Sequence, residues 1–176
     1  SRRPDFQPVE FLKKLREITQ RSGTVLIFDE VITGFRMHPG GAQALFGIKP
    51  DLSSYGKVIG GGLPIGAIAG KKQYMDALDG GWWQYGDESI PEVGVTYFAG
   101  TFVRHPLALI AAKTSLEYFK SRGPALQEEL NAKAAILMNS LNGVCQELNI
   151  PVSIVGFGSM WKIKFKNEVP YNELLF

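Results

Sequence analysis

The chain has 176 residues, of which 45% are hydrophobic and 20% charged, and its 19 Lys and Arg nearly balance its 17 Asp and Glu. A net charge of +2 without a basic run gives no reason to expect binding to nucleic acid or to an anionic membrane. The longest uncharged stretch, 58–70, is too short and too rich in glycine to span a bilayer. Cys145 is the only cysteine, which excludes an intrachain disulfide and favours a reducing, cytoplasmic location.

The first half of the chain alternates helical and strand-like patterns. A helix followed by a strand that is apolar on both faces is typical of α/β architecture. We therefore expect, in order, a helix from Pro8 through Gln20, a buried parallel strand at 24–28, a loop at 32–41, a short helix at 42–46, a strand at 52–55, a buried strand at 65–69 and a short helix at 71–78.

The second half begins with an aromatic loop and ends with a change of pattern. The loop Gly80–Gly94 carries Trp82, Trp83 and Tyr85, and we expect a packed loop or a ligand gate there. A strand at 95–98, a helix at 107–120 opened by Pro106, and a long helix at 125–148 follow. Residues 160–166 alternate apolar and basic side chains, which predicts a strand with one wet face. This change places a domain boundary near residue 151, with a large domain at 1–150 and the start of a small domain at 151–176.

Asp29 and Glu30 follow an apolar run, and that pattern has three interpretations. The acid could hold Mg²⁺ in a nucleotide hydrolase, it could face a ligand at the carboxyl edge of a sheet, or it could cap a turn. The hydrolase needs a phosphate loop of the form G-x-x-x-x-G-K-[ST], and the nearest match, 66–72, is one residue short and lacks the hydroxyl. All three interpretations stay open at this point.

Lys57 follows the second strand and precedes three glycines. A lysine in that position is usually a solvated strand end, but the glycines leave room for a planar ligand, and a partly desolvated amine can act as a Schiff-base nucleophile. Asp29 would then pair with the pyridinium nitrogen of pyridoxal phosphate. Thr101, just before the helix at Pro106, suits either a phosphate or a simple turn. His38 and His105 are too scattered to predict a metal site.

Taken together, these residues resemble the class-III pyridoxal-phosphate aminotransferases, a group that contains ornithine aminotransferase and glutamate-1-semialdehyde aminomutase. The order and spacing of Asp29, Lys57 and Thr101 carry the resemblance. The matching segments are LIFDEVITGFR, PDLSSYGKVIGGGLPIGAIAG, FAGTF and HPLALIAA. Within the group, residues 97–131 look most like the aminotransferase domains of hybrid polyketide/nonribosomal peptide synthetases such as the microcystin and nodularin synthetases.

The resemblance implies a fold-type I pyridoxal-phosphate transferase, with part of the mixed-sheet large domain and the start of a small α+β domain. It implies that Lys57 holds pyridoxal 5'-phosphate covalently, that Asp29 keeps the ring nitrogen protonated, and that Val31 packs on one face of the ring. Thr101 would bind the phosphate, in this family typically that of the neighbouring subunit, so a homodimer is expected. The substrates would be an amino-acid donor and a carbonyl acceptor, in the synthetase domains a β-keto acyl thioester on a carrier protein.

Three departures from the family pattern qualify these expectations. Ile32 stands where many members have a glutamine that contacts the phenolic oxygen of the cofactor, and 103–105 replaces a run of small residues. The segments that supply the upstream phosphate loop are missing, so we expect the 176 residues alone to bind cofactor poorly and to be inactive. The alternatives are a stand-alone glutamate-1-semialdehyde aminomutase, a nucleotide hydrolase and an inactive interaction domain.

Overall fold

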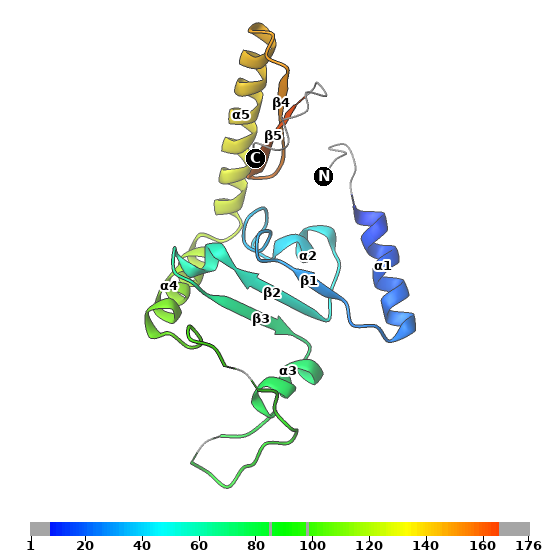
Figure 1. Cartoon of the computed structure of the whole chain (residues 1–176), viewed down its shortest axis with the longest axis vertical. Coiled ribbons are helices and arrows are strands. Elements are labelled where there is room, and N and C mark those ends of the chain that lie inside the picture. Colours follow the sequence, from blue (N-terminus) through cyan, green and yellow to red (C-terminus); the bar gives the residue numbers. More distant parts are fainter. Residues whose placement is uncertain (1–7, 85, 98, 166–176) are drawn as a thin grey trace.

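The computed structural model describes residues 8–84, 86–97 and 99–165. Its centre is a three-stranded sheet in the order β1-β2-β3, formed by Ile27–Asp29, Leu52–Gly56 and Gly66–Gly70. β1 runs parallel to β2, and β3 runs antiparallel to it. Figure 1 shows helix α1 (Val9–Ser22) and the short helix α2 (Gly41–Phe46) beside this sheet. The mixed α/β sheet confirms the expected fold class.

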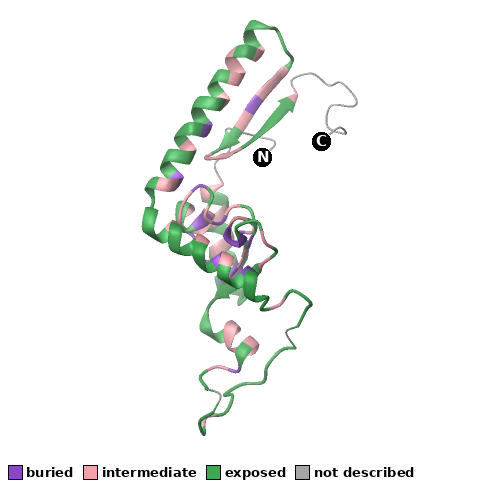
Figure 2. Ribbon diagram, turned by 90° about the vertical axis from the view of Figure 1, so that its left-hand side faces the viewer, coloured by how far each residue is buried: buried purple, intermediate pink, exposed green. Residues whose placement is uncertain are grey.

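The two outer strands are less buried than the sequence predicts. Ile27 on β1 is 59% exposed and Ile68 on β3 is 51% exposed, although both segments were expected to be buried. The physical reason is that no element in the described part of the chain covers these side chains. The core lies instead around Leu26, Ile48 and Ile59. Much of the buried ribbon in Figure 2 lies in the central part of the molecule.

The sheet leads through α3 (Lys72–Asp79) and a long irregular segment to α4 (Pro106–Arg122). Pro106 occupies the first turn of α4, where a missing backbone N–H costs nothing. The strand expected at 95–98 is absent from the described residues 95–97, and Phe98 lies outside them. Thr96 donates its backbone N–H to the Ala77 carbonyl at 2.6 Å, so this stretch is tied to α3 rather than to a strand ladder.

Helix α5 (Ala125–Glu147) and the hairpin β4–β5 (Val152–Phe157, Met160–Phe165) stand away from the central sheet (Figure 1). The hairpin is a two-stranded sheet of its own and packs along α5. The expected apolar face of the last strand is not buried: Trp161 is 46% exposed and Ile163 is 42% exposed. A two-stranded hairpin against one helix does not have enough partners to cover both of its faces. The domain boundary near residue 151 remains a prediction.

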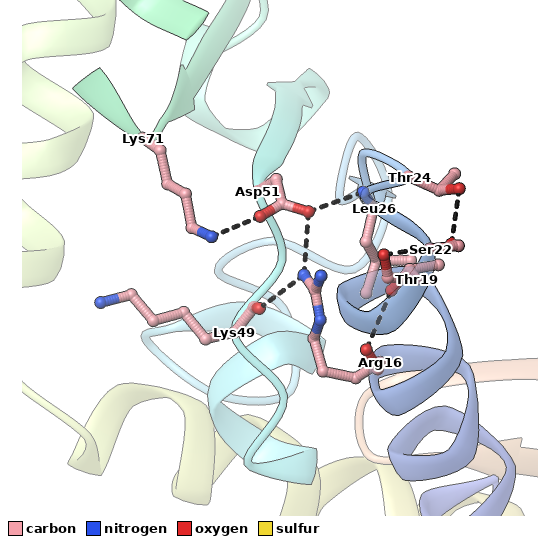
Figure 3. A network of polar contacts seen from close by, with 8 residues as sticks. All are labelled: Arg16, Thr19, Ser22, Thr24, Leu26, Lys49, Asp51 and Lys71. Atoms are coloured by element: carbon pink, nitrogen blue, oxygen red, sulfur yellow. Dashed lines mark hydrogen bonds and ion pairs between the residues drawn. The ribbon is translucent and has the colours of Figure 1, made fainter. Parts of the chain in front are cut away.

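A cluster of charges fixes the end of the sheet opposite the carboxyl end of β1 (Figure 3). Asp51 is 3% exposed and accepts hydrogen bonds from the Leu26 backbone N–H at 2.8 Å and from Arg16 at 2.9 Å, while its other oxygen lies 2.5 Å from the Lys71 amine. The hydrogen bond from Leu26 and the contacts with Lys71 and Arg16 lower the pKa of Asp51 far below its ordinary value. This carboxylate joins α1, the segment before β1 and the end of β3.

Helix α5 is the longest of the described helices at 23 residues. None of the helices in the described ranges combines the length and the apolar character that crossing a bilayer requires.

Candidate active site

Asp29 is the last residue of β1, at the carboxyl end of the strand, where α/β proteins place their ligands. One of its carboxylate oxygens accepts the Val31 backbone N–H at 3.0 Å and the Ser54 hydroxyl at 2.9 Å. These bonds, first that from Val31 and then that from Ser54, lower the pKa of Asp29, and the charge of Lys57 adds to the effect. The carboxylate is therefore ionised near neutral pH and held in one orientation, while its side chain stays open to a ligand.

Lys57 follows β2 directly and begins the single 3₁₀ turn η1 (Lys57–Gly60). Because β1 and β2 are parallel neighbours, with Asp29 opposite Ser54, the ends of the two strands bring Asp29 and Lys57 to the same edge of the sheet. The backbone of Lys57 is left-handed, with φ of 49°, after an extended Gly56. Lys57 is exposed, so its amine is free to meet a ligand.

Gly56, the residue before Lys57, packs closely against Val31 and Ile65. A methyl group at Gly56 would lie 3.5 Å from Val31 Cγ1 and 3.2 Å from the Ile65 carbonyl oxygen. Glycine at this position therefore lets the loop after β1 and the residue before β3 approach β2 closely beside the lysine.

Thr101 lies in the turn that precedes α4. It is exposed, and the hydrogen bond from Val103 to Gly100 closes this turn, five residues before α4 begins. Among the hydrogen bonds of the described ranges, none ties Thr101 to Asp29 or to Lys57. Strand pairing and packing place Asp29, Val31 and Lys57 at one edge of the sheet, and the role of Thr101 stays a prediction.

Glu30 has a structural role that sequence reasoning missed. It is 1% exposed, and its carboxylate accepts the backbone N–H groups of Ala42 at 3.0 Å and Gln43 at 2.8 Å, together with the Thr33 hydroxyl. Gly41 makes this possible, because its φ is 69° and a methyl group there would lie 2.6 Å from a Glu30 oxygen. The only signal in the sequence was the glycine pair at 40–41, which permits such a close approach.

The loop that follows Glu30 is held from outside by α5. Gln127, 2% exposed, donates to the Phe35 carbonyl at 3.1 Å, and Asn131 donates to the Met37 carbonyl at 2.9 Å. The Phe35 ring packs between Tyr55 and Phe119, with centroid distances of 5.9 and 5.6 Å. Helix α5 therefore contributes polar anchors to this loop, and the Phe119 ring of α4 contributes an aromatic contact.

Solved structures with the same fold belong to pyridoxal-phosphate enzymes. An ω-transaminase from Sphaerobacter thermophilus matches with a TM-score of 0.73 and 35% identity, over 92% of this chain and 34% of the transaminase. A transaminase with PLP bound matches with a TM-score of 0.71 and 28% identity, over 88% of this chain and 33% of the other. The fold is that of the PLP-dependent transferases, and the described residues form part of their large domain.

Residues 5–176 match the family model described as aminotransferase class-III, so the chain belongs to that family, whose members use pyridoxal phosphate. The glutamate-1-semialdehyde 2,1-aminomutase of Sulfurihydrogenibium sp. (strain YO3AOP1) is 43% identical over 159 residues, which are 90% of this chain and 34% of that protein. The chain thus spans about a third of the length of this curated relative. Membership of this family argues against the nucleotide-hydrolase alternative.

The residues of the site fit pyridoxal phosphate. An ionised carboxylate and a lysine amine lie at the same sheet edge, and Val31 packs against Gly56, the residue before Lys57. A carboxylate is the group that keeps a pyridinium nitrogen protonated, and a lysine amine is the group that binds an aldehyde covalently. The donor set therefore matches the two ends of the cofactor ring.

Proposed function

We propose that the complete protein containing this chain transfers amino groups with pyridoxal phosphate. The observation that carries the proposal is the placement of Asp29 and Lys57 at the ends of two parallel neighbouring strands, close enough for the lysine charge to lower the pKa of the aspartate. An ionised carboxylate beside a lysine is the arrangement that this chemistry needs.

Each residue then has a distinct task. When bound, pyridoxal phosphate supplies an electron sink for the charge released at the substrate carbon. Asp29 would accept a hydrogen bond from the protonated ring nitrogen, and Val31 would pack on one face of the ring. The Lys57 amine would hold the cofactor covalently and, when free, would remove and return a proton at the substrate carbon. Thr101 would bind the phosphate, and we propose that it does so in the site of a second subunit within a homodimer.

The substrate that the relatives favour is glutamate 1-semialdehyde. Two curated relatives with identities of 43% and 41% carry the name glutamate-1-semialdehyde 2,1-aminomutase. We therefore propose an aminomutase-type reaction, in which the amino group moves within one substrate. We prefer this reaction to transfer of the amino group to a carrier-bound β-keto acyl thioester. Nothing in the comparisons supports the synthetase setting, and carrier-protein or condensation domains in the flanking sequence are the observation that would restore it.

The covalent role of Lys57 is tested by chemical labelling. The complete protein, reconstituted with pyridoxal phosphate and reduced with borohydride, should carry one stable adduct on the peptide that contains Lys57. Peptide mapping by mass spectrometry locates the adduct. Lys57→Ala should abolish it, because the amine whose charge acts on Asp29 would be gone.

Lys71 provides the matched control for this experiment. Its amine is also half-exposed, but it is bound to Asp51 at the far end of the sheet. Lys71→Ala should leave the adduct unchanged. A label that is absent from the wild-type protein, or that maps away from Lys57, would refute the proposed function and favour an inactive interaction domain.

A further inference from the structure

The first turn of α2 connects the two strands that carry Asp29 and Lys57. On one side, the buried Glu30 carboxylate accepts the backbone N–H groups of Ala42 and Gln43. Glu30 also donates its own backbone N–H to the Ser54 carbonyl at 2.9 Å, which continues the pairing of β1 with β2 beyond Asp29. Glu30, the residue before Val31, is therefore held by three hydrogen bonds to backbone groups.

On the other side, the Gln43 side chain reaches β2. Its amide nitrogen donates to the Tyr55 hydroxyl at 2.7 Å and to the Ser53 hydroxyl at 3.2 Å. Ser53 is 4% exposed, and Tyr55 lies two residues before Lys57. Gln43 thus bonds through its backbone to Glu30, at the end of β1, and through its side chain to β2, the strand that leads into Lys57.

We propose that Glu30 and Gln43 are positioning residues that hold Asp29 and Lys57 in register with each other. Neither side chain has to touch the cofactor for this role. Asp29 keeps its orientation through the Val31 N–H, and Glu30, which lies between them in sequence, prevents that short turn from opening. The chemical consequence rests on the proposed function, whereas the structural part can be measured without any cofactor.

The test compares two buried acids in the complete apoprotein by hydrogen exchange. Glu30→Gln keeps the shape of the side chain but turns a donor toward the N–H groups of α2. Amides at 31–36 should then exchange at least about tenfold faster relative to those of α5, because charge-assisted hydrogen bonds are lost locally. The matched control is Asp51→Asn, which removes the charge of a similarly buried acid at the opposite end of the sheet.

Two results would overturn the proposal. One is unchanged exchange at 31–36 relative to α5 in Glu30→Gln. The other is an equal acceleration at 31–36 relative to α5 in Asp51→Asn, which would mean that these amides respond to the loss of either buried acid. A second experiment adds pyridoxal phosphate and tests the effect on function. The pH midpoint of the absorbance change of the bound cofactor should shift in Glu30→Gln and not in Asp51→Asn. If the wild-type protein fails to bind pyridoxal phosphate, the proposed function falls while the exchange result still decides the positioning role.

A double-mutant cycle tests the role of Gln43. Gln43→Leu and Tyr55→Phe each remove one end of the same hydrogen bond, so the double variant should exchange at 53–57 no faster than the faster single variant. Accelerations that simply multiply in the double variant would show that the two side chains act independently, and would refute the bridge.

Discussion

Asp29→Asn should slow amino transfer by the complete protein about 100-fold or more while leaving its thermal unfolding nearly unchanged. The side chain is exposed, so no packing is lost, and asparagine can still accept the Val31 N–H and the Ser54 hydroxyl. What disappears is the negative charge that stabilises a protonated ring nitrogen. Removal of a single preorganised electrostatic group from an active site commonly lowers turnover by this order of magnitude.

The measurement is kcat for the amino donor, together with the melting temperature of the same sample. Ser54→Ala is the matched control, because it removes one hydrogen bond to Asp29 but keeps the charge. It should raise the pKa of Asp29 toward its ordinary value and have a much smaller effect on kcat at neutral pH. Unchanged turnover in Asp29→Asn would remove Asp29 from the mechanism.

Asp51 should dominate the loss of stability in acid. Its pKa in the folded state is lowered, so its stabilising contribution is present above the unfolded-state pKa of about 4 and disappears as the pH falls below that value. Asp51→Asn should therefore lower the free energy of unfolding by roughly 2 kcal/mol at neutral pH and flatten the acid limb of the stability curve. This is less than for a fully buried ion pair, since Lys71 is half-exposed and can turn to water.

Calorimetry between pH 3 and pH 7 checks this expectation. Asp87 is the control, because hydrogen bonds from Ser89 lower its pKa as well, but it lies on the surface of a loop. Asp87→Asn should change the melting temperature little across the range. If Asp51→Asn loses as much stability between pH 7 and pH 3 as the wild-type protein does, other carboxylates control unfolding in acid.

Local patterns predicted most of the helices and strands correctly. Helical periodicity and the stops at Gly123 and Pro151 located α4 and α5 within a few residues, because those signals act over short distances. Burial was predicted less well. An apolar pattern reports which face prefers to be covered, and Ile27 and Trp161 remain exposed because the covering partner is not among the described residues. Periodicity alone cannot supply that partner.

In the candidate site, too, some residues could be predicted from local sequence patterns and others could not. Motif spacing predicted a site with Asp29, Val31 and Lys57, and adjacent parallel strands place Asp29 and Lys57 at one edge of the sheet. Their roles in the site stay predictions. Glu30 was missed because its partners are backbone N–H groups of residues 42 and 43, and no side-chain pattern records that contact. Gln127 was missed for a related reason: its acceptor is a main-chain carbonyl 92 residues away.

The left-handed backbone of Lys57 carries an energetic signature of its own. A residue with a side chain is less stable in this conformation by about 1–2 kcal/mol, whereas glycine adopts it freely. Even after the greater chain entropy of glycine is counted, Lys57→Gly should unfold at a temperature no lower than wild type, and a clear fall in a thermal melt would contradict this. A position where the native residue is not the most stable one is under selection for something other than folding. In this protein, that trade between durability and reactivity falls on the residue that we propose to be the covalent anchor.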